Sequence, residues 1–71
     1  MINTAKIKGR ITEKGKTIQI IAPQIPCSPY TLGQQINNKK PMTITTAEKL
    51  CKILDIRDEE FTEFFLQEKL Q

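Results

Sequence analysis

The residue types that most often carry catalysis or metal binding are sparse in this chain. It has no histidine, and its two cysteines, Cys27 and Cys51, stand far apart. Histidine is the commonest general base and neutral metal ligand, so its absence and this cysteine spacing exclude a zinc site and a Cys–His nucleophile. No pair of carboxylates falls in an apolar setting that would tune one of them for acid–base work. We therefore expect no enzymatic activity, no cofactor and no small-molecule substrate.

Lysine and arginine are plentiful, but they are unevenly distributed. Residues 1–40 hold seven basic residues against one acidic residue, a net charge of +6, whereas residues 41–71 hold four against seven, a net charge of −3. The basic residues of the first part are Lys6, Lys8, Arg10, Lys14, Lys16, Lys39 and Lys40. This distribution is typical of a protein whose first half faces a polyanion or an acidic protein surface. A solvated surface without a binding role is the alternative.

Length and hydropathy define the setting in which these residues act. A chain of 71 residues that is 38% apolar predicts one small domain over residues 1–71 with a modest core. No segment approaches the roughly 18 continuous apolar residues that a membrane-spanning helix needs, and residues 1–6 lack the apolar stretch of a secretory signal. We expect a protein of the reducing cytoplasm, where both cysteines stay reduced.

Apolar periodicity and helix-capping residues predict an all-α protein with five short helices. The first covers residues 4–14 and stops at Gly15, a residue that readily closes a helix. The second starts after the N-cap Thr17 and must be short or bent, because Pro23 falls within it. The β-branched run at residues 17–21 is also compatible with a strand, but no alternating partner or hairpin turn lies nearby.

The third helix has the clearest start in the sequence. Ser28 supplies a capping oxygen, and a proline follows at the first helical position, where its missing amide hydrogen has no partner to lose. The helix covers Pro29–Asn37, with Leu32 and Ile36 facing inward. A turn over residues 37–41 follows, in which asparagine tolerates the left-handed conformation.

Two further helices complete the predicted fold. Thr43 caps the fourth, and its buried stripe is expected to consist of Ile44, Ala47, Leu50, Cys51 and Leu54. The fifth covers residues 58–70 and begins at Asp58, where the helix dipole favours negative charge, and its three phenylalanines share an inward face. Leu66 and Leu70 point to roughly the opposite side and offer a surface for a homodimer or another partner, with simple exposure as the alternative.

Several short motifs follow one another in a recognisable order. Ser28 followed by Thr31-Leu32 begins the third helix, Asn37-Asn38-Lys39 ends it, and Leu50–Ile56 lies in the fourth. In this order they resemble the helix-turn-helix of the Cro/CI (XRE) family of phage and bacterial regulators, especially its short phage-encoded members. The resemblance implies a lambda-repressor-like domain with its helix-turn-helix at about residues 17–37 and the third helix in the major groove of double-stranded DNA.

The resemblance also gives roles to individual residues. It places four at the exposed, base-facing positions and three on the phosphate side: Pro29, Tyr30, Gly33 and Gln34, then Asn37, Lys39 and Lys40. In that role Gln34 can pair bidentately with adenine, and Tyr30 can stack on or contact a thymine methyl group. Plain solvent-facing polar residues are the alternative. Because one such helix reads only a few base pairs, a homodimer on an operator is expected.

Departures from the family pattern favour a second function. Ile18 stands where many relatives have a phosphate-binding glutamine, Pro23 shortens the second helix, and Pro26 replaces the glycine of the tight turn. The third helix contains no Arg or Lys, so the commonest guanine contact is missing. The second function is that of an antirepressor, which binds a cognate repressor protein through the face around Ile18, Pro23, Pro26, Pro29 and Tyr30.

A further departure concerns the core. The family often pairs an arginine of the first helix with a glutamate near the end of the recognition helix, and here those positions hold Ile11 and Ile36. We expect an apolar contact between them, a replacement that is often neutral or stabilising because two desolvated charges are removed together. Of the two functions, operator binding explains the basic first half and is the one that the sequence favours.

Overall fold

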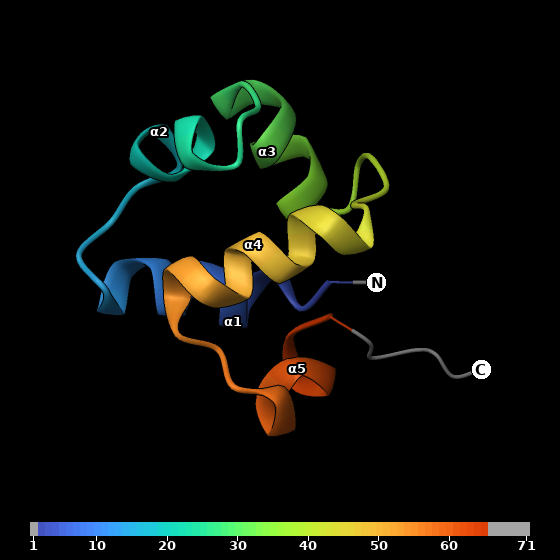
Figure 1. Ribbon diagram of the computed structural model, residues 1–71. Coiled ribbons are helices and arrows are strands. Elements are labelled where there is room, and N and C mark those ends of the chain that lie inside the picture. The colour runs from blue at the N-terminus through green and yellow to red at the C-terminus, as the bar shows by residue number, and fades with distance from the viewer. Residues whose placement is uncertain (1, 66–71) are drawn as a thin grey trace.

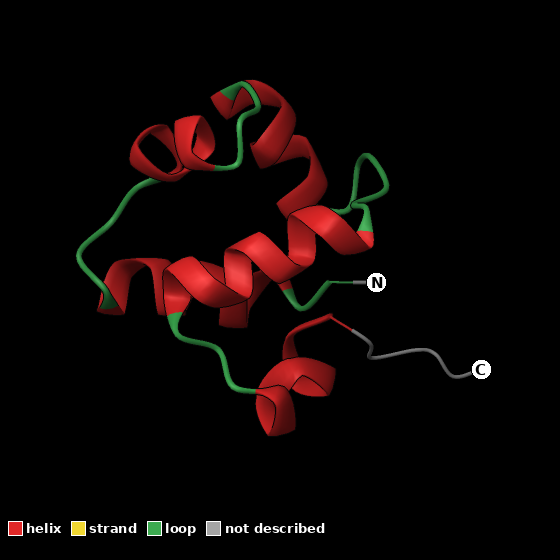
Figure 2. Cartoon of the chain, viewed as in Figure 1, coloured by secondary structure: helices red, strands yellow, loops and turns green. Residues whose placement is uncertain are grey.

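The computed structural model describes residues 2–65, and every regular element within them is helical (Figure 2). The elements are α1 (Thr4–Glu13), α2 (Ile18–Ile21), the 3-10 helix η1 (Ala22–Gln24), α3 (Pro29–Ile36), α4 (Ile44–Leu54) and α5 (Asp58–Phe65). The predicted all-α class with five α-helices is confirmed for this part of the chain. Residues 17–21 form no strand, and Leu66 and Leu70 lie outside the described residues.

The helices divide the molecule into two ends. α2, η1 and α3 lie together at one end and α5 lies at the other, with α1 and α4 between them (Figure 1). None of the helices in residues 2–65 is long and apolar enough to cross a membrane.

Side-chain caps define where the first four α-helices begin. The hydroxyl oxygens of Thr17, Ser28 and Thr43 each accept a hydrogen bond from the backbone amide three residues later, at 3.2, 3.0 and 3.1 Å. These are the three caps predicted from the sequence. Asn3 supplies a fourth, which was not predicted, by accepting from the amide of Lys6 at 3.2 Å. Each cap satisfies an amide that has no partner within its helix.

Left-handed backbone conformations mark three of the turns. They occur at Gly15, Asn38 and Asp55, with φ of 68°, 64° and 55°. The first was predicted as a helix stop and the second lies in the predicted turn, whereas the third was not anticipated. Helices α1 and α3 each end one residue earlier than predicted, at Glu13 and Ile36, because the next residue has ψ of only 2° or 10°.

Proline shapes the region between α2 and α3. Helix α2 has only four residues, after which the chain tightens into η1 with Pro23 in its first turn. A proline lacks the amide hydrogen of an α-helical bond, so the predicted short or bent helix is confirmed. Pro26 lies in the loop that follows and is not among the positive-φ residues of the described chain.

One buried cluster joins all five α-helices. Its fully buried large side chains are Ile7, Ile21, Leu32, Ile36, Leu50 and Leu54. Ile11 and Ile36, the pair that replaces the family's ion pair, both belong to this cluster, with 6% and 0% of their surface exposed. Burying side chains of this size stabilises the fold by about 1.5–3 kcal/mol each.

Two residues of the predicted α4 stripe are less buried than expected. Ile44 is 64% exposed, so its predicted burial is wrong. It is the first residue of α4, and the buried part of the helix begins one turn later, at Ala47. Cys51 is only half-buried, on the border of the stripe.

Residues at the N-terminus connect distant parts of the chain. The side chain of Asn38 bonds to both backbone groups of Ile2: its Oδ1 accepts from the Ile2 amide and its Nδ2 donates to the Ile2 carbonyl, each at 2.9 Å. The amide of Asn3 donates to the carbonyl of Phe64 in α5 at 2.8 Å. The first residues therefore hold the turn after α3 and the end of α5 in place.

Candidate functional site

The segment that forms α2, η1 and α3 carries no formal charge, although the ammonium group of Lys49 in α4 donates to the carbonyl of Ile25 at 3.5 Å. Between Lys16 and Lys39 the sequence contains no acidic or basic residue. Its exposed apolar side chains, which we call the α2–α3 face, are Ile20, Pro23, Pro26, Pro29 and Tyr30. Two large ones stand out: Ile20 is 50% exposed and Tyr30 is 71% exposed. Prolines and a tyrosine lose little conformational freedom when bound, so this surface is suited to contact with another molecule.

The predicted base-facing residues do not all reach solvent equally. Pro29 and Tyr30, at the start of α3, are exposed as predicted, whereas Gly33 and Gln34 are half-buried, which corrects their predicted exposure. The space above Gly33 is open, because a Cβ atom built on this residue would meet no atom within 4 Å. A groove wall or a partner side chain can therefore approach the backbone of α3 closely at this point.

Hydrogen bonds order the outward side of α3. Gln34 Nε2 donates to the hydroxyl oxygen of Tyr30 at 3.3 Å, and Asn37 Nδ2 donates to the carbonyl of Gly33 at 2.9 Å. Neither bond uses the amide oxygen of Gln34 or its second N–H. Within residues 2–65, one acceptor and one donor of this side chain thus form no hydrogen bond, and this is the combination that a bidentate contact with adenine needs.

The exposed isoleucine of α2 differs from the one that the sequence indicated. Ile18, predicted to lie on the partner face, is half-buried and packs against the core. Ile20 is exposed in its place. The spacing of the buried residues Ile21, Ala22 and Ile25 already leaves position 20 off the inward stripe of a helix, so this residue was within reach of sequence reasoning.

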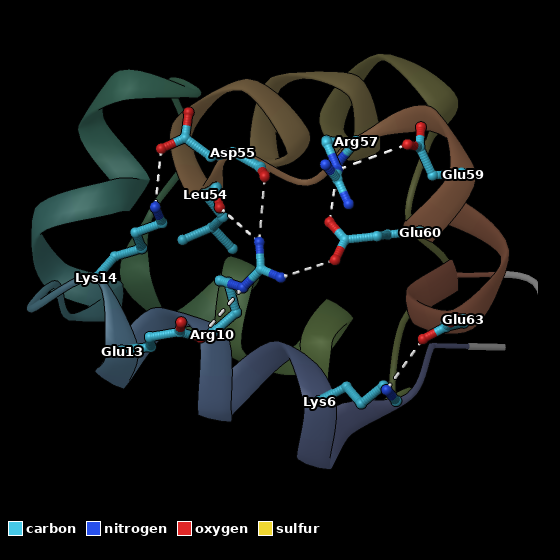
Figure 3. A network of polar contacts seen from close by, with 10 residues as sticks. All are labelled: Lys6, Arg10, Glu13, Lys14, Leu54, Asp55, Arg57, Glu59, Glu60 and Glu63. Carbon is cyan, nitrogen blue, oxygen red and sulfur yellow. Dashed lines mark hydrogen bonds and ion pairs between the residues drawn. The ribbon is translucent and has the colours of Figure 1, made fainter.

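Folding brings the basic half of the chain against the acidic half. Three of the seven cations of residues 1–40 form ion pairs with acidic residues of the second half (Figure 3). The pairs are Lys6–Glu63 at 3.1 Å, Arg10–Glu60 at 3.2 Å and Lys14–Asp55 at 2.9 Å. The charge separation along the sequence is therefore only partly a separation in space, because three of the seven cations meet acidic residues of the second half.

Arg10 is the centre of this network. Its Nη1 donates to the backbone carbonyls of Leu54 and Asp55, at 3.0 and 3.2 Å, while Nη2 faces Glu60 (Figure 3). The guanidinium also lies over the ring of Phe64, 5.2 Å from its centre. With only 16% of its side chain exposed, this arginine joins α1 to the α4–α5 turn and to α5. Its role is structural, and sequence reasoning did not single it out.

The pKa values of two carboxyl groups in the network reflect these contacts. The hydrogen bond and the charge of Lys14 lower the pKa of Asp55 below its usual value. The pKa of Glu60 is lowered mainly by the hydrogen bond from the backbone amide of Arg57, with a further contribution from Arg10. Both groups are held in the ionised form, which suits ion pairing and not proton transfer.

The two cysteines are free and half-buried. Burial, followed by the nearby charges of Asp58 and Glu48, raises the pKa of the Cys51 thiol. The neutral thiol is a poor nucleophile and metal ligand, so this residue acts as a small apolar side chain.

Four cations of the first half form no ion pair within residues 2–65. They are Lys8, Lys16, Lys39 and Lys40, of which the last two belong to the predicted phosphate-side set. Lys16 comes directly before the N-cap residue of α2. Lys39 and Lys40 follow α3, close in the sequence to the exposed Asn37. Positive charge that forms no ion pair within residues 2–65 therefore stands at both ends of the uncharged α2–α3 segment, and the charge of Lys16 also acts on Asp55.

None of the protein-family models, curated proteins or solved structures compared with this chain matches it. The α2–α3 face and the lysines at its two ends are thus the basis for the functional proposal.

Proposed function

We propose that the chain is a transcription regulator of the lambda-repressor-like, Cro-like kind that binds operator DNA. In this proposal α2 and α3 form a helix-turn-helix, and α3 enters the major groove. The observation that supports it is the placement of the free lysines: Lys16 precedes α2, and Lys39 and Lys40 follow α3, while Lys6 and Arg10 are neutralised by α5. Cations on either side of a recognition helix favour DNA binding, because phosphate contacts position the helix on the duplex.

Base contacts then fall to the polar groups of α3. Gln34 offers a donor and an acceptor, and Tyr30 offers an exposed ring for a thymine methyl group. No arginine or lysine lies in α3, so the usual contact to guanine is absent. We therefore expect the operator to be read mainly at A·T base pairs.

A second candidate function is supported by the apolar character of the same face. Ile20 and Tyr30 are large and exposed, and three prolines accompany them. Buried aromatic anchors contribute strongly to protein interfaces. In this alternative the chain is an antirepressor: the face binds a cognate repressor protein and blocks its DNA-binding surface, and the flanking lysines meet acidic residues of that partner.

One titration series separates the two functions. The purified protein is titrated by fluorescence anisotropy against duplex DNA from the promoter beside its gene, and against a random duplex of equal length at the same moderate salt concentration. A preference of about 100-fold or more for the promoter duplex supports operator binding. Equal affinity for the two duplexes overturns it, because any basic patch binds DNA in that way. Tight binding to a repressor encoded beside the gene, without DNA preference, supports the antirepressor.

A further inference from the structure

The turn after α3 carries two lysines to which the proposed function gives phosphate contacts. Lys39 and Lys40 are both exposed, and neither forms an ion pair within residues 2–65. Their backbone amides both donate to the carbonyl of Gln34 in α3, at 2.8 and 3.3 Å. The turn is therefore folded back onto the last part of α3, and the position of its backbone determines where the two ammonium groups lie.

The side chain of Asn38 fastens this turn to the N-terminal part of the chain. Its Oδ1 accepts from the amide of Ile2 and its Nδ2 donates to the Ile2 carbonyl, each at 2.9 Å. Nδ2 also donates to the hydroxyl oxygen of Thr4 at 3.3 Å, and this hydroxyl donates to the carbonyl of Ile36 in α3 at 2.7 Å. Both N–H groups and the oxygen of the Asn38 amide are thus used in holding the turn.

The backbone to which Asn38 is bonded is itself held in place. Ile2 is half-buried and packs against the core. The amide of the next residue, Asn3, donates to the carbonyl of Phe64 in α5 at 2.8 Å. A partner that moved with the turn would restrain nothing, whereas this one is fixed by the core and by α5. The bonds of Asn38 therefore restrict the turn relative to the body of the protein.

The backbone conformation of Asn38 allows the side chain to be tested separately from the turn. Its φ is 64°, in the left-handed region. Glycine adopts this conformation without strain and has no side-chain amide. Asn38→Gly thus removes the bonds to Ile2 and Thr4 and retains a backbone that suits the turn.

We propose that Asn38 is a positioning residue for the phosphate contacts of Lys39 and Lys40. It acts through the backbone of the turn, and its own amide is already used in bonds to Ile2 and Thr4. Restricting the turn before binding reduces the freedom that the two lysines lose when they meet a duplex. This inference rests on the proposed function, from which it takes the phosphate contacts.

The first test is made on the free protein. Hydrogen exchange followed by NMR reports on the amides of Lys39 and Lys40, and Asn38→Gly is expected to speed their exchange by about tenfold or more, with unchanged helical content. Asp55→Gly is the matched control, because it makes the same kind of change at the other left-handed residue that is not glycine within residues 2–65. It should leave the exchange of the two lysine amides unchanged.

The second test measures the salt dependence of binding to a random duplex. Asn38→Gly removes no charge, yet it is expected to reduce the slope of log K against log salt by about one phosphate contact. A purely structural role would lower the melting temperature and leave the slope of the folded protein as it is in wild type. In a chain that already carries Lys39→Ala and Lys40→Ala, the same change should reduce the slope no further.

Distinct results overturn this inference and the proposed function. Unchanged exchange of both amides in Asn38→Gly contradicts the hold of the side chain on the turn, and faster exchange with an unchanged slope contradicts the positioning role. Equal affinity for promoter and random duplexes contradicts operator binding and leaves this inference standing, because the slope is measured on the random duplex. A wild-type chain that binds neither duplex contradicts both.

Discussion

The side-chain amide of Gln34 donates to the hydroxyl oxygen of Tyr30, one turn earlier in α3, at 3.3 Å. This bond joins the two residues that the two candidate functions use differently. Operator binding relies on the amide of Gln34, while the antirepressor relies on the ring of Tyr30. Variants at the two positions therefore report on which molecule the face binds.

Gln34→Ala is expected to weaken binding to the promoter duplex by about 1–3 kcal/mol and to relax the preference at one base pair, with little change on random duplex. Tyr30→Phe keeps the ring and removes only the acceptor, so its loss should be smaller. Anisotropy titrations at fixed salt concentration measure both. Equal losses on the two duplexes would show that Gln34 reads no base. For an antirepressor, Tyr30→Ala costs about 2 kcal/mol or more in repressor binding and Gln34→Ala costs little.

The free lysines are expected to act through phosphates. Lys16→Ala and Lys39→Ala should each weaken binding to every duplex and reduce the slope of log K against log salt by about one phosphate contact. Lys6→Ala is the matched control, because this lysine is paired with Glu63 at 3.1 Å and should leave the slope unchanged. Titrations at several salt concentrations measure the slopes, and equal slopes for all three variants contradict the phosphate role.

The buried position of Ile36 makes a charge there costly. Ile36→Glu places an unpaired carboxylate in the core and is expected to lower the free energy of unfolding by several kcal/mol, about 3–5 for an uncompensated buried charge. Adding Ile11→Arg should recover part of this loss if the two positions adjoin. Thermal melts of both single variants and the double variant decide the matter. If the two substitutions change the free energy of unfolding in a strictly additive way, positions 11 and 36 do not interact.

Arg10 is expected to matter more for stability than any other ion-pairing residue. Arg10→Ala removes hydrogen bonds to two carbonyls and to Glu60, and should cost about 2 kcal/mol or more. Arg57→Ala is the matched control, because its ion pair with Glu59 spans 3.7 Å and is about 70% exposed on both sides, so it should cost less than about 1 kcal/mol. Urea denaturation measures both. Similar midpoints for the two variants would mean that the Arg10 network contributes little.

Stability should fall on acidification because of Asp55 and Glu60. Both carboxyl groups have lowered pKa values in the folded protein, so the unfolded chain takes up protons first as the pH falls below about 4.5. The contribution of the two carboxylates to the free energy of unfolding is complete at pH values above the ordinary carboxyl pKa range. It is lost progressively as the pH falls through their pKa values in the folded protein. Melts between pH 7 and pH 3 measure the decline. Asp55→Asn, which tolerates the left-handed backbone, should flatten it, and a stability that rises on acidification contradicts the assignment.

Local features of the chain could be predicted from the sequence because their causes lie within a few residues. Ser28 caps α3 through an amide three positions on, Pro23 shortens α2 through its own missing hydrogen, and Gly15 adopts the left-handed backbone that few other residues tolerate. The period of the apolar residues likewise placed Leu32 and Ile36 in the core.

Only the tertiary structure decided which charges stay free. Lys6, Arg10 and Lys14 look equivalent to Lys16 and Lys39 in the sequence, and the difference arises because α5 and the turn before it pack against α1 and bring acidic residues within 3.1, 3.2 and 2.9 Å. The exposure of Ile44 has the same kind of cause. Its position in the helical period is that of a buried residue, but the buried part of α4 begins only one turn later, at Ala47. The periodicity of one helix does not show how far its neighbours cover it.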